Sequence, residues 1–288
     1  MEPENSVQVL FVGSSIVFCD IVPAVIFQET GITSYLVAGP QQTMPIAYYC
    51  IREACKTQKP EAVFVELRSL FFPQYGEHTI ANYAFMPRGL NRLEAILKTA
   101  RKEDVPGLLF PVLDYHDRWN DITWSELSER LRPATVSANA GYMKLEYAEE
   151  QGEITSSHPD TSYTRECVSY LKKISDFCSE QGISLYVFYA PATNTVDQET
   201  KDKVIQLIRG LNISGYYDYT TEEALQEIGL DKKVDWADDI HLNGSGAEVF
   251  SAYLGKLLDA EGLKPSHLDL NLSIWLLRIN DFYSEMIE

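Results

Sequence analysis

The stretch that decides the fold lies near the N-terminus and reads Val9-Leu10-Phe11-Val12-Gly13-Ser14-Ser15-Ile16. Four apolar residues run directly into Gly-Ser-Ser, which predicts a buried strand that ends in a tight turn. The two serines can also be interpreted as a helix cap, and one can cap a helix while the other stays exposed. In open α/β sheets, ligands bind beyond the carboxyl ends of the strands. Ser15 is therefore predicted to lie where chemistry takes place.

Strand and helix patterns alternate along the rest of the chain. Apolar runs predict further strands at 35–38, 62–67, 184–190 and 216–219, with a weaker one at 108–112, where Pro111 favours a sheet edge. Apolar residues at helical spacing predict helices at about 22–29, 44–56, 90–97, 161–178, 204–211 and 249–258. This alternation is typical of an α/β fold with a mostly parallel sheet.

The alternation stops once, which sets the expected domain organisation. Residues 113–158 are polar and aromatic with weak periodicity, and such a long stretch is typical of a lid or binding loop. We expect a single domain over residues 1–264 that contains this insertion. Residues 265–288 are predicted to form a helical extension that docks on the domain. A dimer contact and a membrane-interfacial helix are the alternatives for it, although its acidic residues disfavour the membrane.

Composition narrows the classes of partner and ligand. The formal net charge is −18, which argues against a nucleic-acid partner. The five cysteines are scattered without a C-x-x-C pair, a pattern that favours reduced thiols over a disulfide framework or a zinc site. No residues have the spacing of metal ligands, so we expect no metal and no cofactor. The oligomeric state is not predicted.

A second motif lies near the C-terminus and reads Asp235-Trp236-Ala237-Asp238-Asp239-Ile240-His241-Leu242-Asn243-Gly244. Asp238 precedes His241 by three residues, so its carboxylate can orient the imidazole through one nitrogen while the other faces a nucleophile. The motif D-x-x-H alone occurs often by chance. The motif is more significant in this chain because Ser15, a candidate nucleophile, lies near the other end of the sequence.

The two motifs together resemble those of the SGNH (GDSL-type) hydrolase superfamily, whose first block is Gly-Asp-Ser-Leu where this chain has Gly13-Ser14-Ser15-Ile16. The resemblance implies a three-layer flavodoxin-like sandwich with a central, mostly parallel five-stranded sheet. It also implies that Ser15 is the nucleophile, His241 the general base and Asp238 its orienting partner. Asp235 and Asp239 are out of register with the family spacing.

The chain departs from the family pattern at the oxyanion hole. Gly39 fits the second block, which supplies a backbone amide. The third block supplies an asparagine, but here the strand at 62–67 is followed by Arg68. Either Arg68 or the side chain of Gln41 or Gln42 substitutes, or only two backbone donors remain. Because losing one donor costs about 10²–10³ in turnover, a slow or acceptor-dependent enzyme is expected.

Within the superfamily, the chain is similar to bacterial SGNH-like proteins with a Gly-Ser-Ser first block, which are related to cell-envelope and exopolysaccharide O-acylation. The stretch from His116 to Trp119 contributes to this similarity, and His116, Arg118 and Trp119 are candidates for substrate contact. Equally, Trp119 can pack on the domain with Arg118 on the surface. The resemblance also implies a membrane-bound acyltransferase as partner and an extracytoplasmic, membrane-anchored location. A chain that is complete as given would instead be cytoplasmic.

The two motifs and the family resemblance together imply a serine-dependent acyl-ester hydrolase. Such an enzyme would be an esterase or deacetylase that acts on small-molecule, carbohydrate or cell-envelope esters. An O-acyltransferase would use the same three residues, so the sequence does not separate hydrolysis from transfer. The remaining alternative is a non-catalytic carbohydrate-binding or envelope-assembly protein of the same fold, which the missing asparagine favours.

Overall fold

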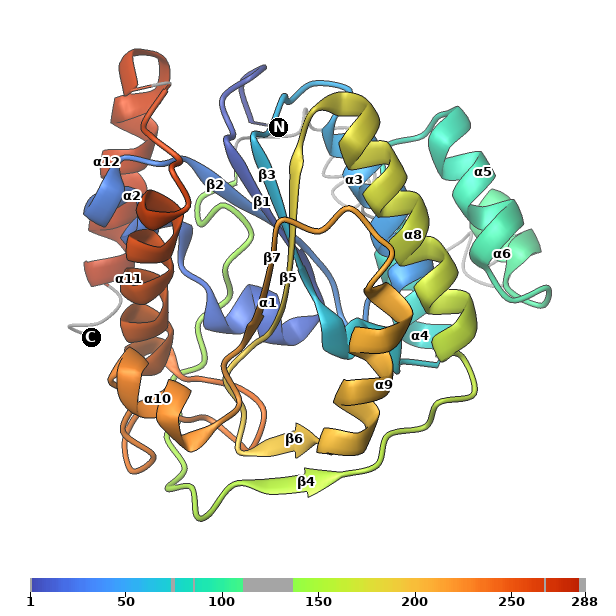
Figure 1. The fold of residues 1–288 in the computed structure, drawn as a ribbon. Coiled ribbons are helices and arrows are strands. Elements are labelled where there is room, and N and C mark those ends of the chain that lie inside the picture. Colours follow the sequence, from blue (N-terminus) through green and yellow to red (C-terminus); the bar gives the residue numbers. More distant parts are fainter. Residues whose placement is uncertain (1, 74–75, 85, 111–136, 267, 285–288) are drawn as a thin grey trace, which may run out of the picture.

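The fold is described from a computed structural model of the 288-residue chain (Figure 1). The structure describes residues 2–73, 76–84, 86–110, 137–266 and 268–284. Helices cover both faces of a central five-stranded parallel sheet. The chain therefore has the α/β three-layer sandwich that the alternation of strand and helix patterns predicts.

The order of the strands places the N-terminal turn at a special point of the sheet. The sheet runs in the order β2-β1-β3-β5-β7 and is built from β1 (Val9–Gly13), β2 (Ser34–Ala38), β3 (Ala62–Glu66), β5 (Ser184–Tyr189) and β7 (Gly215–Asp218). All neighbouring pairs are parallel. The chain moves outward from β1 to β2 and then returns to β3 on the other side of β1. Ligands bind at such a switch point in doubly wound sheets, and the turn after β1 lies there.

Alternating strand residues divide the core into two layers, because successive side chains of a strand point to opposite faces. One set packs under α3 (Met44–Ala54), α8 (Thr164–Gln181) and α9 (Gln198–Ile208) and consists of Leu10, Val12, Val63, Val65, Leu185 and Val187. The other set packs under α2 (Pro23–Thr30), α10 (Glu222–Ile228) and α11 (Gly244–Ala260) and consists of Val9, Phe11, Ala62, Phe64, Tyr186 and Phe188. Both faces of the sheet are thus buried, which explains the continuous apolar runs.

Shorter helices follow β3, and one of them overturns a predicted strand. The 3₁₀ helix η1 (Leu67–Leu70) is followed by α4 (Gly76–Ala84), α5 (Leu90–Thr99) and α6 (Val105–Leu109). The strand predicted at 108–112 is wrong where the structure describes it, since Leu108 and Leu109 end α6. Pro106 stands in the first turn of this helix, where the missing amide proton costs nothing and the fixed φ favours helix.

The described part of the predicted insertion is an extended strap that crosses the carboxyl edge of the sheet (residues 137–158, green in Figure 1). Backbone hydrogen bonds attach it along its length: Met143 N–H donates to Phe18 O (2.8 Å) and Glu149 N–H to Trp236 O (2.8 Å). Strand β4 (Thr155–Ser157) pairs with β6 (Asn194–Val196). Residues 137–158 are therefore anchored to the domain and do not form a free lid.

The C-terminal helix α12 (Leu268–Ser284) docks on α2, as predicted for the extension. Trp275 stacks on Phe27 with ring centroids 4.9 Å apart, and Arg278 Nη2 pairs with Glu2 Oε1 at 2.7 Å. In the part of the chain that the structure describes, no helix combines the length and apolar character needed to span a bilayer.

Candidate active site

Ser15 is the first residue of the short helix α1 (Ser15–Asp20), which begins immediately after β1. Ser14 stands at the N-cap position, but its side chain is buried and makes no capping hydrogen bond. Ser15 is partly exposed at the carboxyl edge of the sheet. Of the two serines, Ser15 is therefore the one that a substrate can reach.

His241 lies in a tight loop between α10 and α11, and local hydrogen bonds shape this loop. Trp236 forms an antiparallel bridge with Leu242, which brings the two ends of the loop together. Between them, Asp238 Oδ1 accepts hydrogen bonds from the backbone N–H of Ile240 (2.9 Å) and of His241 (2.8 Å). An aspartate commonly closes a turn in this way, by accepting from backbone groups two or three residues further on. The spacing D-x-x-H thus fixes the carboxylate beside the imidazole.

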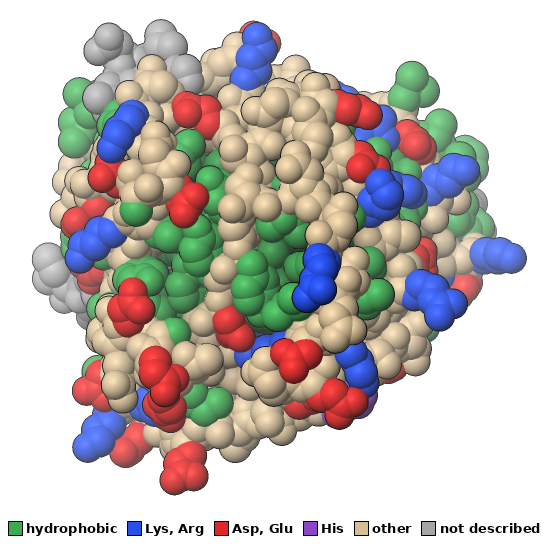
Figure 2. All heavy atoms as spheres, in the orientation of Figure 1, with side chains coloured by type: hydrophobic (Ala, Val, Ile, Leu, Met, Phe, Trp, Pro, Cys, Tyr) green, Lys and Arg blue, Asp and Glu red, His purple; other side chains and the backbone are tan. Residues whose placement is uncertain are grey.

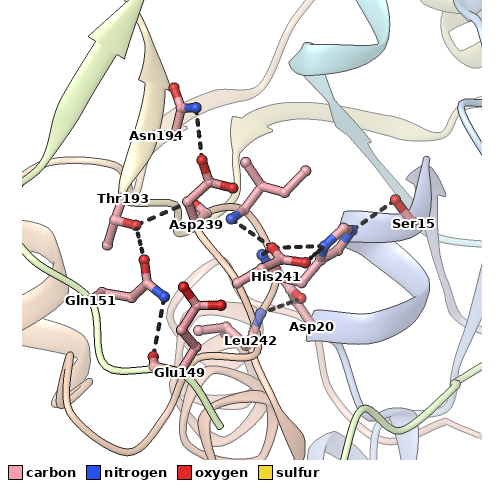
Figure 3. A network of polar contacts seen from close by, with 11 residues as sticks. Ser15, Asp20, Glu149, Gln151, Thr193, Asn194, Asp239, His241 and Leu242 are labelled. Carbon is pink, nitrogen blue, oxygen red and sulfur yellow. Dashed lines mark hydrogen bonds and ion pairs between the residues drawn. The ribbon is translucent and has the colours of Figure 1, made fainter. Parts of the chain in front are cut away.

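The structure brings Ser15, His241 and Asp238 together. Ser15 and His241 point toward one another although they are 226 positions apart in the chain (Figure 3). His241 Nε2 lies 2.9 Å from Ser15 Oγ. His241 Nδ1 lies 2.9 Å from Asp238 Oδ2 and 3.0 Å from Asp238 Oδ1. One ring nitrogen therefore faces the hydroxyl while the other faces a carboxylate, which is the arrangement of a Ser-His-Asp triad.

The two neighbouring aspartates have other partners. Asp235 accepts hydrogen bonds from Ser245 Oγ (2.7 Å) and from the N–H of Asp231 (2.8 Å), so it braces the start of α11. Asp239 accepts a hydrogen bond from Nδ2 of Asn194, the first residue of β6, at 2.8 Å (Figure 3). Asp238 is thus the carboxylate in register with the imidazole.

Gly39, the predicted oxyanion-hole residue, lies beside the end of β1. Its N–H donates to the carbonyl of Gly13 at 3.3 Å, so in this structure the amide is engaged within the sheet. A Cβ at position 39 would lie 1.9 Å from Asn82 Oδ1. Asn82 comes from α4, and its Nδ2 donates to Pro40 O (2.9 Å). An asparagine side chain therefore does approach Gly39, but from a helix that the sequence did not single out.

The other residues predicted to contact substrate or to complete the oxyanion hole are Gln42, Arg68, His116, Arg118 and Trp119. Gln42 is buried and its Nε2 donates to Val37 O (2.9 Å), so it braces the turn after β2 instead of facing a ligand. Arg68 is partly exposed, and its guanidinium donates to Asn194 O. His116, Arg118 and Trp119 lie outside the described residues.

Two buried carboxyl groups near the triad were missed from the sequence. Glu66 ends β3, is fully buried and accepts a hydrogen bond from the N–H of Arg68 (2.9 Å). Burial raises the pKa of Glu66 to about 7, although that hydrogen bond and the Arg68 guanidinium lower it. Asp20, at the end of α1, is also fully buried, and burial raises its pKa well above the usual value. The sequence does contain a signal for both buried carboxyl groups. Asp20 is the single acidic residue in the apolar stretch 16–27, and Glu66 is the single acidic residue in the apolar stretch 62–67.

A scan against models of known protein families finds no match to this chain, and a search of curated proteins finds no related sequence. Function is therefore inferred from the geometry of the site. Among the described residues, no three His, Cys, Asp or Glu side chains are grouped so that they could hold a metal ion.

Proposed function

We propose that this protein is a serine-dependent acyl-ester hydrolase of the SGNH type. One observation carries the proposal: Ser15 Oγ lies 2.9 Å from His241 Nε2 while Asp238 holds the opposite ring nitrogen. A serine hydroxyl is a weak nucleophile on its own and becomes effective when an adjacent base accepts its proton. The hydrogen-bond distance satisfies the geometric requirement for such a base.

The reaction would proceed in two steps. Ser15 Oγ attacks the ester carbonyl carbon as its proton passes to His241 Nε2. The tetrahedral intermediate then collapses, the alcohol leaves with the proton from His241, and an acyl group remains on Ser15. A water molecule, activated by the same imidazole, attacks this acyl-enzyme and releases the carboxylic acid. Asp238 holds the ring in the required orientation and stabilises the positive charge that the ring gains.

The negative charge that develops on the carbonyl oxygen needs hydrogen-bond donors. The backbone N–H of Ser15 is the first in α1 and has no partner within the helix, so it is the donor we expect to contribute. The amide of Gly39 can contribute only by leaving the carbonyl of Gly13. The loss of one such donor lowers turnover about 10²–10³-fold, so we expect slow hydrolysis of simple esters.

The charge of the protein favours an uncharged substrate. Acidic side chains crowd the lower part of the face in Figure 2, around the carboxyl edge of the sheet, in a chain of net charge −18. This field repels anionic esters and leaves neutral ones unaffected. Neutral short-chain acyl esters of carbohydrate or cell-envelope sugars are the substrate class that we propose. Transfer of the acyl group to a sugar hydroxyl uses the same residues, and a sugar-acetate assay with and without polyol acceptors would separate it from hydrolysis.

A fluorophosphonate probe tests the proposal without knowledge of the substrate, because it reacts with activated serines. We expect the wild-type protein to be labelled and the variants Ser15→Ala and His241→Ala to remain unlabelled. Ser14→Ala is the matched control, since Ser14 is the adjacent serine, is buried and makes no capping hydrogen bond. Labelling that survives in Ser15→Ala, or that is lost in Ser14→Ala, would contradict the assignment.

A second candidate function is a non-catalytic carbohydrate-binding or envelope-assembly protein of the same fold. The engaged amide of Gly39 favours it, since it leaves fewer donors for an oxyanion. Complete absence of labelling in a folded wild-type protein would support this alternative over the enzyme.

A further inference from the structure

One side chain connects the helix that carries Ser15 to the loop that carries His241. Asp20 is the last residue of α1, and none of its side chain is exposed. Its Oδ1 accepts a hydrogen bond from the backbone N–H of Leu242 at 2.9 Å (Figure 3). Leu242 directly follows His241 in the chain. Asp20 therefore bridges two segments that are 222 positions apart.

This bridge acts at the opposite end of α1 from Ser15. With a rise of about 1.5 Å per residue, the two residues are separated by roughly 7–8 Å along the helix axis. The histidine loop thus contacts α1 at both ends, through His241 at the first residue and through Leu242 at the last. Two contacts at the ends of a short rigid element fix its orientation as well as its distance from the loop.

We propose that Asp20 is a positioning residue that holds the His241 loop against α1 and so keeps Nε2 within hydrogen-bond distance of Ser15 Oγ. This inference rests on the proposed function, because it assigns Asp20 a role in the same reaction. Asp20 does not contact the reacting atoms and acts through the backbone of Leu242.

The surroundings of Asp20 indicate that its role needs an acceptor oxygen and not a negative charge. Burial raises the pKa of Asp20; the hydrogen bond from Leu242 opposes this, and the carboxylates of Asp238 and Glu66 raise the pKa further. The guanidinium of Arg68 lowers it in part. Asp20 Oδ2 has no hydrogen-bond partner among the described residues. An asparagine would keep the accepting oxygen and place its amide nitrogen where no existing bond is lost.

Removing the acceptor should affect chemistry more than binding. A buried N–H without a partner is costly, so the backbone at Leu242 would shift to find one. Because His241 is the adjacent residue, the shift would move its ring relative to Ser15. A misplacement of about 1 Å in a catalytic group can cost about 100-fold in rate.

The structure offers a matched control in Ser251 of α11. Its hydroxyl accepts a hydrogen bond from the N–H of Val22 at 2.7 Å, and the residue is fully buried. This contact joins the same two parts of the chain, the segment after α1 and the segment after the histidine. It lies away from the reacting atoms, so its loss should lower stability and leave the reaction rate unchanged.

The experiment measures the kinetics of fluorophosphonate labelling for the wild-type protein, Asp20→Ala, Asp20→Asn and Ser251→Ala. We expect Asp20→Ala to lower the maximal labelling rate about 10- to 100-fold while the half-saturating probe concentration changes little. Asp20→Asn should restore the rate to within about threefold of the wild type, and Ser251→Ala should match the wild type, since neither loses the Leu242 contact. Asp20→Leu, which lacks the acceptor but fills the space, replaces Asp20→Ala if circular dichroism shows that the alanine variant is unfolded.

Each outcome has a defined meaning. The inference is overturned if Asp20→Ala and Asp20→Leu react as fast as Ser251→Ala, or if Asp20→Asn is as slow as Asp20→Ala. If both acceptor-free variants are unfolded, hydrogen exchange of the Leu242 amide decides, because the proposal requires protection in the wild type and in Asp20→Asn. If the probe does not label the wild-type protein, both the proposed function and the role of Asp20 are overturned. If the wild-type protein is labelled and the acceptor-free Asp20 variants are labelled equally fast, only the role of Asp20 is overturned.

Discussion

We expect the buried carboxyl of Glu66 to make the stability of the folded protein depend on pH. A single substitution at Glu66 should remove this contribution. Burial raises its pKa from the usual 4.5 to about 7. Between these two pH values the folded protein keeps a proton on Glu66 that the unfolded chain releases. Stability should therefore fall as pH rises through this window, and the contribution of Glu66 should be constant above it.

The size of the effect follows from the shift. Each pKa unit corresponds to about 1.4 kcal/mol, so the full penalty on Glu66 is about 3 kcal/mol once the carboxyl is ionised in both states. Between about pH 5.5 and about pH 8.5, the expected change is about 2 kcal/mol. Glu66→Gln keeps an oxygen that can accept from the N–H of Arg68 and has no proton to lose. The variant should therefore gain about 2 kcal/mol relative to the wild type across this range.

Urea unfolding followed by tryptophan fluorescence at both pH values measures this difference and needs no substrate. Glu61→Gln is the matched control, because Glu61 lies just before the start of the same strand but is exposed. We expect its stability to parallel that of the wild type at both pH values. A constant difference between Glu66→Gln and the wild type, or a loss of stability in Glu66→Gln at high pH, would refute the assignment of a raised pKa to Glu66.

Two further predictions concern the supports of the site. Asn243 caps α11 by accepting hydrogen bonds from the N–H groups of Ser245 (3.0 Å) and Gly246 (3.1 Å), so Asn243→Ala should cost about 1 kcal/mol of stability, measured by urea unfolding. Asn243→Ser, which can still cap, should cost less, and equal losses would contradict the capping role. Gly39→Ala should lower the melting temperature, because the new Cβ would lie 1.9 Å from Asn82 Oδ1. Combining it with Asn82→Ala should recover part of the loss, and strictly additive losses would show that the clash is not the cause.

The elements that the sequence predicted are those whose pattern depends on near neighbours in the chain. The apolar runs that became β1, β3 and β5 are buried on both faces, and a strand in that position must be apolar throughout. The relation of Asp238 to His241 is equally local, because a side chain that accepts backbone N–H groups two and three residues further on is fixed by the turn itself. By contrast, the strand expected at 108–112 is wrong where the structure describes it, because the apolar residues Leu108 and Leu109 end the short helix α6.

The sequence by itself thus determined the α/β layering, the turn after the first strand and the register of the aspartate with the histidine. Only the tertiary structure decided that the amide of Gly39 is engaged with Gly13, and that Asp20 and Glu66 are buried carboxyl groups beside the triad. The physical reason is that burial and hydrogen-bond partners depend on segments far apart in the chain. The hydrogen bonds that Asp20 and Ser15 make to the histidine loop span 222 and 226 positions, and no local pattern specifies such contacts.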